Sequence, residues 1–242
     1  MQYFANSDRG LVRPRNQDRY LTLPLPGGAL LAAVFDGMGG HADGDLAAET
    51  ARDAFSTVFS AVTAPLTPEA GADLLTAATR EADRAILALT AAGDGGVGMG
   101  TTVTSLLLLP TVALTLNVGD SRIYRYRLGE LCRLTRDDSY VQELIDRGLL
   151  LPEEAPLHPR RNVITRALGS LGEAPLTVGR LDVLRGDTYL LCSDGLYGMT
   201  GEPFLSRILS QQLGTAATVG YLIAAANEKG GTDNITAALV RV

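Results

Sequence analysis

Short apolar segments of strand length recur along this chain, and several of them end at an Asp-Gly, Gly-Asp or Ser-Asp-Gly turn. The clearest is the run of residues 29–35, which leads directly into Asp36 and Gly37. A continuous apolar run of this length predicts a buried strand that delivers an aspartate to a loop. Segments of the same quality predict strands at residues 19–23, 106–109, 112–118, 122–126, 188–192 and 235–242.

Helical segments lie between these strands. Residues 68 to about 91 carry apolar side chains at spacings of three and four. Thr67 before Pro68 is typical of a helix start, since proline suits the first helical position. Other helices are expected at residues 45–62, 139–147, 202–213 and 215–228. Because helices come in pairs between runs of strands, the order favours an α+β fold, with antiparallel sheets covered by helices, over strict βαβ alternation.

Residues 137–172 depart from this pattern, since a short helix is followed by a proline-rich, basic stretch at residues 151–161. We expect an inserted flap there. The length of 242 residues, with 46% hydrophobic and 20% charged residues, is sufficient for one large core. Because we find no internal repeat, low-complexity tract or linker, we expect residues 1–242 to form a single domain.

The overall charge narrows the classes of partner. The net charge is −6 and no block of five like charges occurs, so neither a nucleic-acid-binding stripe nor a basic membrane patch is indicated. No apolar run approaches the roughly 18 residues needed to cross a bilayer. The N-terminus lacks a basic start followed by an apolar segment, which a secretion signal requires. We therefore expect a cytoplasmic protein that binds neither nucleic acid nor membranes.

The chain contains few cysteines and histidines that could bind a metal ion. Cys132 and Cys192 each stand among strand-like residues and are expected to be reduced core thiols. The only histidines are His41 and His158, so a zinc site built mainly from histidine and cysteine is almost excluded. Any bound metal must rely on oxygen ligands.

Four aspartates stand where expected strands meet glycine-rich or polar turns, namely Asp36, Asp120, Asp194 and Asp233. Each one alone is explained by turn chemistry, because Asp-Gly is a favoured turn pair. The recurrence of all four favours a different interpretation. Carboxylates gathered at loop ends repel one another unless cations lie among them, and hard oxygen ligands suit Mg²⁺ or Mn²⁺.

Two further segments point to phosphate chemistry at such a site. The glycine-rich residues 36–41 lack the Lys-Ser/Thr ending of a nucleotide-binding P-loop and the spacing of a dinucleotide-binding fingerprint. Their glycines instead let the backbone approach a metal, so that the carbonyl of Gly37 can be a ligand. Arg13 lies in a dense polar stretch, and its planar fork matches phosphate oxygens. A surface salt bridge is the alternative role for Arg13. Together these features predict a metal-dependent hydrolase of phosphate esters.

Taken in order, these segments resemble the protein phosphatase 2C-type (PPM) family, and specifically its compact bacterial serine/threonine phosphatases. The resemblance runs essentially from end to end. It is carried by GLVR and NQD at residues 10–18, VFDGMGGH at 34–41, GMGTT at 98–102, NVGDSR at 117–122, LLCSDGL at 190–196 and GGTDNIT at 230–236.

The resemblance implies a four-layer fold in which two central antiparallel sheets pack face to face between helices. It also implies a binuclear Mg²⁺ or Mn²⁺ centre in the cleft at one end. In such enzymes the residue matching Asp36 bridges both ions and the carbonyl matching Gly37 ligates one of them. The residues matching Asp194 and Asp233 bind the other ion.

Further roles follow from the same resemblance. The Asp18 equivalent holds a metal-bound water, and the Asn234 equivalent supports the neighbouring ligand. In bacterial members the residue matching Asp120 binds a third, looser ion with help from the Asp194 equivalent and the flap. Asn162 lies at the flap position that can face that third ion.

The implied activity is hydrolysis of phosphoserine and phosphothreonine in proteins. A water that bridges two cations has a lowered pKa and can attack phosphorus in line, without a covalent intermediate. Arg13 would orient the phosphate oxygens. His41 is the candidate acid for the leaving group, and a structural hydrogen bond is its alternative role. His158 is expected to be structural or to lie on the flap surface.

Two positions depart from the pattern of relatives. Met38 follows Asp36-Gly37, where many animal relatives carry histidine, and this leaves the identity of the acid open. Gln17 replaces a glutamate that is common before the aspartate, which predicts a thinner ligand shell for the second metal.

The expected partners are phosphorylated proteins, including a serine/threonine kinase and its substrates. A catalytically silent binding or sensor domain of the same fold, a phosphatase dedicated to one regulatory protein and a small-molecule phosphatase remain alternatives. The presence of Asp36, Asp194 and Asp233 argues against the silent domain.

Overall fold

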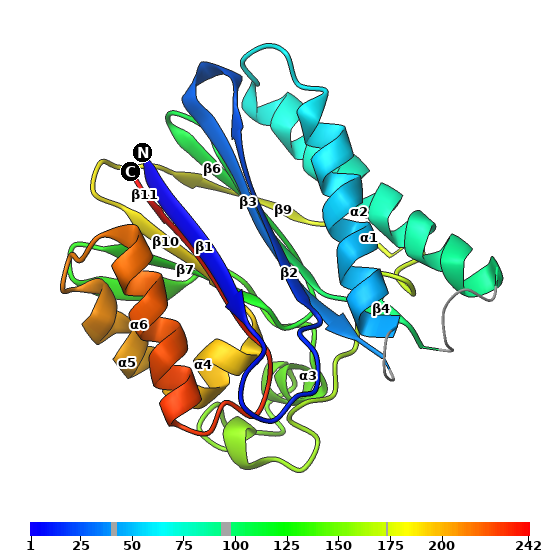
Figure 1. Cartoon of the computed structure of the whole chain (residues 1–242), viewed down its shortest axis with the longest axis vertical. Coiled ribbons are helices and arrows are strands. Elements are labelled where there is room, and N and C mark those ends of the chain that lie inside the picture. Colours follow the sequence, from blue (N-terminus) through cyan, green and yellow to red (C-terminus); the bar gives the residue numbers. More distant parts are fainter. Residues whose placement is uncertain (40–42, 93–97, 173) are drawn as a thin grey trace.

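A computed structural model describes residues 1–39, 43–92, 98–172 and 174–242. Two antiparallel β-sheets form its centre, and helices cover both outer faces (Figure 1). The five-stranded sheet has the order β1 (Gln2–Asp8), β11 (Ile235–Arg241), β10 (Thr188–Cys192), β7 (Arg122–Arg127) and β8 (Glu130–Arg133). The six-stranded sheet has the order β2 (Asp18–Leu25), β3 (Ala29–Met38), β5 (Val103–Leu108), β6 (Val112–Val118) and β9 (Val178–Asp182), and β4 (Gly100–Thr101) pairs with β3.

The helices divide between the two sheets. Helices α1 (Asp43–Ser60) and α2 (Pro68–Ala92) cover the six-stranded sheet, whereas α4 (Asp194–Thr200), α5 (Glu202–Leu209) and α6 (Thr215–Glu228) lie on the five-stranded sheet (Figure 1). Helix α3 (Tyr140–Asp146) and a 3₁₀ turn, η2 (Ala155–Leu157), belong to the flap, and a second 3₁₀ turn, η1 (Pro26–Gly28), joins β2 to β3. The expected α+β class with antiparallel sheets between helical layers is confirmed.

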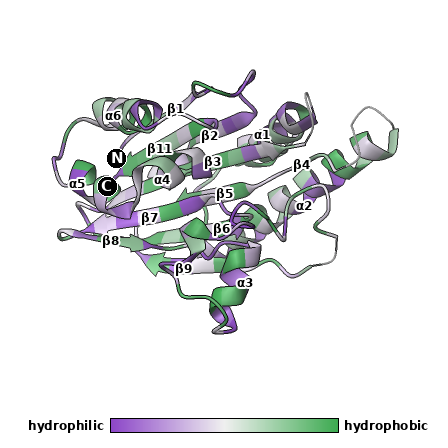
Figure 2. Cartoon of the chain, turned by 90° about the horizontal axis from the view of Figure 1, so that it is seen from below, coloured by the Kyte–Doolittle hydropathy of each residue, from purple (hydrophilic) through white to green (hydrophobic). Residues whose placement is uncertain are grey.

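Strand β3 shows why its sequence is apolar without interruption. Leu31, Ala33 and Phe35 pack against α1 and α2, whereas Leu30, Ala32 and Val34 pack against the other sheet. A strand covered on both faces needs apolar side chains at every position. Hydrophobic residues accordingly follow the central strands in Figure 2.

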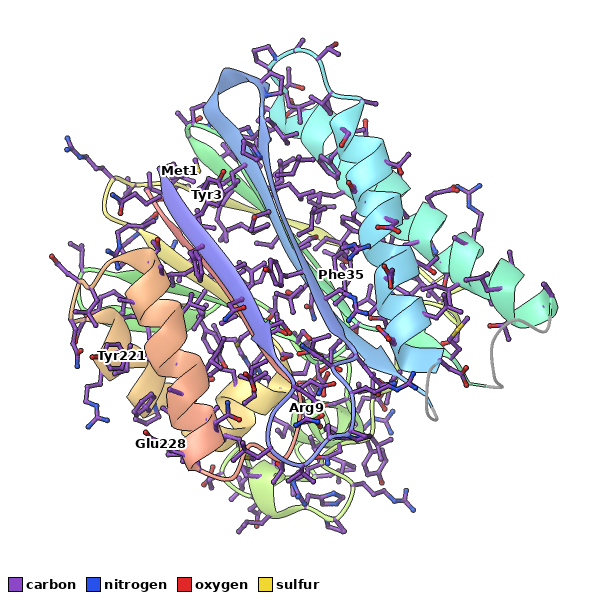
Figure 3. All side chains as sticks on the ribbon, in the orientation of Figure 1. Met1, Tyr3, Arg9, Phe35, Tyr221 and Glu228 are labelled. Atoms are coloured by element: carbon purple, nitrogen blue, oxygen red, sulfur yellow. The ribbon has the colours of Figure 1, made fainter. Side chains whose placement is uncertain are left out.

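Helix α1 packs on this sheet through a stripe at a spacing of four, formed by Ala47, Ala51, Phe55 and Phe59. The ring of Phe55 meets that of Phe35 edge to face, with centroids 5.3 Å apart. Phe35 therefore lies between β3 and α1 (Figure 3). This contact fixes the strand immediately before Asp36.

Several elements differ from the sequence-based expectations. The predicted strand at residues 29–35 continues to Met38, because Asp36 pairs with Asp18 of β2. Helix α5 ends at Leu209 rather than at residue 213. Strands β1, β4, β8 and β9 and helix α4 were not predicted; β4 has only two residues, and β1, β8 and β9 are edge strands with polar residues. Cys192 is a buried thiol as predicted, but the prediction was wrong for Cys132, which is exposed on edge strand β8.

The flap predicted at residues 137–172 leaves the sheets after β8 and contains α3 and η2. Its base is closed by a bridge between Ser139 and Ile164, and its last part returns to β4 through a bridge between Leu168 and Thr101. Among the described residues, no helix is both long enough and apolar enough to cross a membrane.

Candidate active site

The predicted aspartates gather at one end of the two sheets, where the chain passes from one sheet to the other. Asp18 and Asp36 are direct partners on β2 and β3. Asp194 begins α4 immediately after β10, and Asp233 lies just before β11, which pairs antiparallel with β10. Asp120 lies in the turn between β6 and β7, which belong to different sheets. The pairing of the strands thus brings together side chains from distant parts of the sequence.

The carboxyl groups of Asp36 and Asp194 are close enough for the charge of one to influence the other. Loss of hydration raises the pKa of Asp36 well above its ordinary value, and the charges of Asp18, Asp194, Asp120 and Asp233 raise it further. Asp36 nevertheless keeps part of its surface exposed. Because each of these carboxylates opposes ionisation of its neighbours, the cluster favours a compensating cation.

Burial raises the pKa of Asp18 to about 7, although hydroxyl donors oppose this shift. Thr236 Oγ1 and Ser193 Oγ each donate to Asp18 Oδ2 over 2.7 Å. Burial and the charge of Asp233 raise the pKa of Asp194 to about 6. The roles of Ser193 and Thr236 were not predicted, although both lie within segments that carry the family resemblance, because their contacts depend on the pairing of β10 with β11.

The residues present fit a divalent cation. Asp18 Oδ1 and Asp120 Oδ1 are buried and have no hydrogen-bond partner among the described residues. Within those residues, no three acidic, histidine or cysteine side chains enclose an ion by themselves. The charges of Asp18, Asp120, Asp194 and Asp233 all act on Asp36, so these carboxylates are neighbours. Backbone carbonyls and water would complete the coordination of an ion among them, as is usual for Mg²⁺.

The backbone beside Asp36 is tightly packed. Thr102 N–H and Thr101 Oγ1 both donate to the carbonyl of Asp36 over 2.9 Å. A Cβ atom on Gly37 would lie 2.1 Å from the carbonyl oxygen of Gly44, so only glycine allows this approach of β3 to the start of α1. Gly37 is therefore fixed in position next to Asp36. The predicted acid, His41, lies outside the described residues.

Arg13 lies at the exposed side of the carboxylate cluster. Its Nη2 donates to Asp233 Oδ2 over 2.7 Å, and the guanidinium also interacts with the charges of Asp194 and Asp36. Half of the Arg13 side chain is exposed. Arg13 therefore forms the salt bridge that was one of its two predicted roles. Because its partner Asp233 is itself a predicted metal ligand, the same salt bridge also holds Arg13 where a phosphate anchor would be needed.

Asn234 fixes the loop that carries Arg13. Its Oδ1 accepts from Gln17 N–H, and its Nδ2 donates to the carbonyls of Arg9 and Arg15, all over 2.8 Å. Asn234 is the residue after Asp233, so these three bonds link the loop at residues 9–17 to a predicted metal ligand. The proposed role of Asn234 as a support for the neighbouring ligand stays a prediction.

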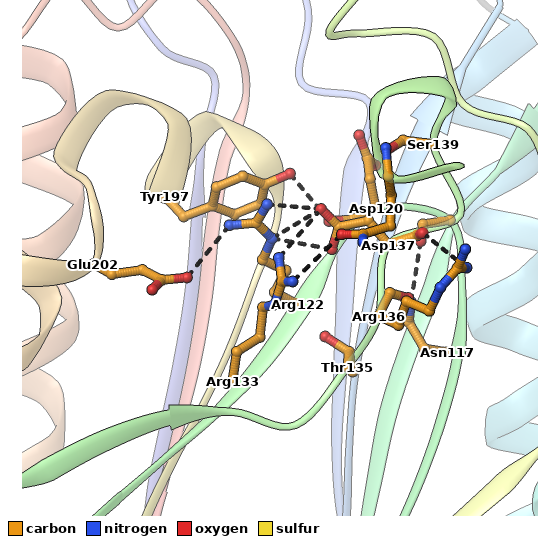
Figure 4. A network of polar contacts seen from close by, with 12 residues as sticks. Asn117, Asp120, Arg122, Arg133, Thr135, Arg136, Asp137, Ser139, Tyr197 and Glu202 are labelled. Atoms are coloured by element: carbon orange, nitrogen blue, oxygen red, sulfur yellow. Dashed lines mark hydrogen bonds and ion pairs between the residues drawn. The ribbon is translucent and has the colours of Figure 1, made fainter. Parts of the chain in front are cut away.

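A cleft of about 800 Å³ opens beside the cluster between α4 and the flap. Asp120, Asp194 and Asp233 line one side of it, and Asn162 lines it from the flap. Tyr197 Oη donates to the backbone carbonyl of Asp120 over 3.1 Å, as Figure 4 shows together with the surrounding polar network. His158 lies outside the lining of the cleft; its Nδ1 accepts from Arg160 N–H within the flap.

Two antiparallel sheets packed face to face between helices, with clustered aspartates and an accessible arginine at one end, define the class of metal-dependent phosphatases. Residues 13–229 match the family model described as protein phosphatase 2C. The chain belongs to the protein phosphatase 2C family of serine/threonine protein phosphatases.

Three relatives show the extent of the similarity. The serine/threonine protein phosphatase PstP of Mycobacterium tuberculosis is 39% identical, over 100% of this chain and 45% of that protein. The serine/threonine phosphatase stp of Listeria monocytogenes is 36% identical, over 97% of this chain and 93% of that protein. A solved catalytic domain of PstP in complex with two manganese ions is 36% identical, with a TM-score of 0.85 over 98% of this chain and 96% of that one. The chain thus spans about half the length of the Mycobacterium relative.

Proposed function

We propose that this chain is the catalytic part of a metal-dependent protein phosphatase that hydrolyses phosphoserine and phosphothreonine. The observation that carries the proposal is the cluster of mutually coupled aspartates with Arg13 at its exposed side. The names of the curated relatives and the two manganese ions in the solved PstP domain support it. Phosphorylated proteins, including a serine/threonine kinase and its substrates, are the proposed partners.

In this proposal Asp36, Asp194, Asp233 and the carbonyl of Gly37 would hold two Mg²⁺ or Mn²⁺ ions. Asp120 and Asn162, which line the same cleft, would contribute to a third, looser ion. The bound ions supply Lewis acidity and make water a nucleophile near neutral pH. These ligands come from loops and strand ends of both sheets, so their relative positions are set by rigid elements.

The remaining residues position the reactants. Asp18 is held through Oδ2 by Ser193 and Thr236, and its buried Oδ1, which has no hydrogen-bond partner among the described residues, would accept a hydrogen bond from a water molecule. Arg13 uses one nitrogen on Asp233 and keeps other donors of its fork for phosphate oxygens. The cleft between α4 and the flap gives space for the polypeptide that carries the phosphate.

The test uses the purified chain with Mn²⁺, a phosphothreonine peptide and p-nitrophenyl phosphate. We expect both substrates to be hydrolysed, chelation to abolish turnover, and calorimetry to count at least two ions per chain. Metal-replete protein without turnover on either substrate would contradict the proposal and favour a silent binding domain. Hydrolysis of the aryl phosphate alone would favour a small-molecule phosphatase.

A further inference from the structure

Arg122 is a buried cation next to the site, and sequence reasoning gave it no role. It begins β7, two residues after Asp120, and only 17% of its side chain is exposed. Its Nε donates to both carboxylate oxygens of Asp137, over 3.0 and 3.1 Å, and its Nη2 donates to Oδ2 over 2.7 Å. Asp137 is the first residue of the flap. The fork of Arg122 therefore ties the start of the flap to the central sheet.

The other face of the same guanidinium meets helix α4. Arg122 Cζ lies 3.7 Å from the ring centroid of Tyr197, a cation–π contact within the protein interior. Tyr197 is three residues after Asp194, and its Oη donates to the backbone carbonyl of Asp120. Figure 4 shows that Arg122 lies between Tyr197 and Asp137. One side chain thus contacts both α4 and the flap base.

Backbone hydrogen bonds connect the flap base to the turn that holds Asp120. Asp138 N–H donates to the carbonyl of Gly119 over 2.8 Å, and Gly119 N–H donates to Asp138 Oδ2 over 3.2 Å. Thr165 N–H donates to the carbonyl of Asp138 over 2.8 Å, so the returning arm of the flap joins the same point. Both arms of the flap therefore meet next to Asp120.

We propose that Arg122 is a positioning residue that holds the flap, the Asp120 turn and helix α4 in one fixed arrangement for the reaction on peptide substrates. This inference rests on the proposed function. The flap forms one side of the cleft, and Asp120 and Asp194 line the other side. Arg122 contacts elements on both sides, so it sets the width of the cleft where the polypeptide would lie.

The proposed role depends on the planar fork and not on charge alone. Besides its bonds to Asp137, Arg122 donates through Nη1 to Tyr124 Oη over 3.1 Å, and Tyr124 Oη in turn donates to Glu202 Oε1 on α5. A lysine keeps the charge but cannot bind both oxygens of Asp137 or lie flat on Tyr197. Arg122→Lys is therefore the informative variant.

Arg127→Lys is the matched control. Arg127 ends the same strand β7, has 18% of its side chain exposed, and binds Asp187 with Nε over 2.6 Å and Nη2 over 2.7 Å. The two arginines have similar exposed fractions, and each binds both oxygens of one carboxylate. Of the two, Arg122 lines the cleft and Arg127 does not. If the role of Arg122 were merely structural, the two substitutions should have equal effects.

The experiment compares wild type, Arg122→Lys and Arg127→Lys by hydrogen–deuterium exchange and by steady-state kinetics with Mn²⁺. For Arg122→Lys we expect at least about tenfold faster exchange at the amides of Asp138 and Thr165, and an increase of about tenfold in KM for a phosphothreonine peptide, the effect of one charge-assisted hydrogen bond. KM for p-nitrophenyl phosphate should change less than about twofold, since it does not reach the flap. Arg127→Lys should change none of these quantities.

Equal exchange rates and equal peptide KM in the two lysine variants would overturn the proposal. Tyr197→Phe gives a second test that does not disturb the ion pair: it should lower kcat/KM for the peptide about threefold while flap exchange stays at the wild-type rate. Wild-type kcat/KM in Tyr197→Phe would contradict the link from Arg122 to Asp120. If the wild-type chain hydrolyses neither substrate, the proposed function fails, and the exchange rates alone still decide whether Arg122 holds the flap.

Discussion

Replacement of Asn234 by alanine tests how the loop that carries Arg13 is held. The side chain of Asn234 is buried and makes three hydrogen bonds of 2.8 Å to backbone groups of Arg9, Arg15 and Gln17. Each such bond contributes about 1 kcal/mol net. We expect Asn234→Ala to lower the free energy of unfolding by about 3 kcal/mol, because all three bonds are lost and no donor or acceptor replaces them.

The same substitution should affect phosphate binding. Without these bonds, residues 9–17 are held here mainly by the Arg13–Asp233 ion pair and the backbone bonds from Leu11 and Val12 to Gly231, so Arg13 is positioned less firmly. We therefore expect KM for p-nitrophenyl phosphate to rise about tenfold, the effect of one charge-assisted hydrogen bond to the phosphate. Urea unfolding with unchanged m-values measures the first effect, and steady-state kinetics with saturating Mn²⁺ measures the second.

Asn227→Ala is the control for this prediction. Asn227 Nδ2 makes one side-chain hydrogen bond, to Asp8 Oδ1 over 3.1 Å. Its replacement should cost about 1 kcal/mol and leave KM unchanged. An Asn234→Ala protein that loses less than about 1 kcal/mol and keeps the wild-type KM would refute the reasoning that this side chain organises the loop.

Two further substitutions test the electrostatics. Asp36→Asn should lower kcat by about 100-fold or more, since the loss of residues that merely support metal ligands already has effects of about that size. In the presence of a chelator it should not lower the melting temperature, because burial already raises the pKa of Asp36 and disfavours its charge. A wild-type kcat would exclude Asp36 as a shared ligand. Burial acts to raise the pKa of Asp187, but donors led by Arg127 hold it below its ordinary value. Ionised Asp187 therefore stabilises the fold above about pH 4, and this contribution is lost as the pH falls through its folded pKa. Asp187→Asn should cost about 2 to 3 kcal/mol at pH 7, and the cost should decrease steadily as the pH falls below about 4, by urea unfolding; a cost independent of pH would contradict this assignment.

The helices and strands that depend only on the pattern of neighbouring residues could be predicted from the sequence. Helix α6 begins and ends where expected, and the core of β3 is apolar throughout because both faces are covered. Helix α4 was missed because its first residues, Asp194 and Gly195, also form a favoured turn pair. Glycine at position 195 is required by close packing against the backbone of Asn234, where a Cβ would lie 2.0 Å from the carbonyl oxygen, and this requirement depends on tertiary structure.

The site was predictable in its carboxylates but not in the groups that orient them. Aspartates at the ends of apolar runs can be read directly from the sequence. The hydrogen bond from Thr236 to Asp18, in contrast, joins residues 218 positions apart and requires that β11 and β2 lie next to each other. The contact of Arg122 with Asp137 likewise depends on the path of β8 back to the flap. Such partners follow from tertiary packing, and the local pattern carries no signal for them.

The position of the carboxylates between the two sheets links the site to the packing of the whole fold. Asp18 and Asp36 belong to the six-stranded sheet, whereas Ser193 and Thr236, which donate to Asp18, lie at the ends of strands of the five-stranded sheet. The loops that carry Arg13 and Asp120 are both crossings between the sheets. Separation of the sheets would therefore disperse the cluster, and a cation that binds only the assembled cluster stabilises the packed sheets by mass action. The mutual repulsion of the aspartates has the opposite effect. Because both effects act at the same boundary, occupancy of the site and packing of the two sheets are thermodynamically coupled.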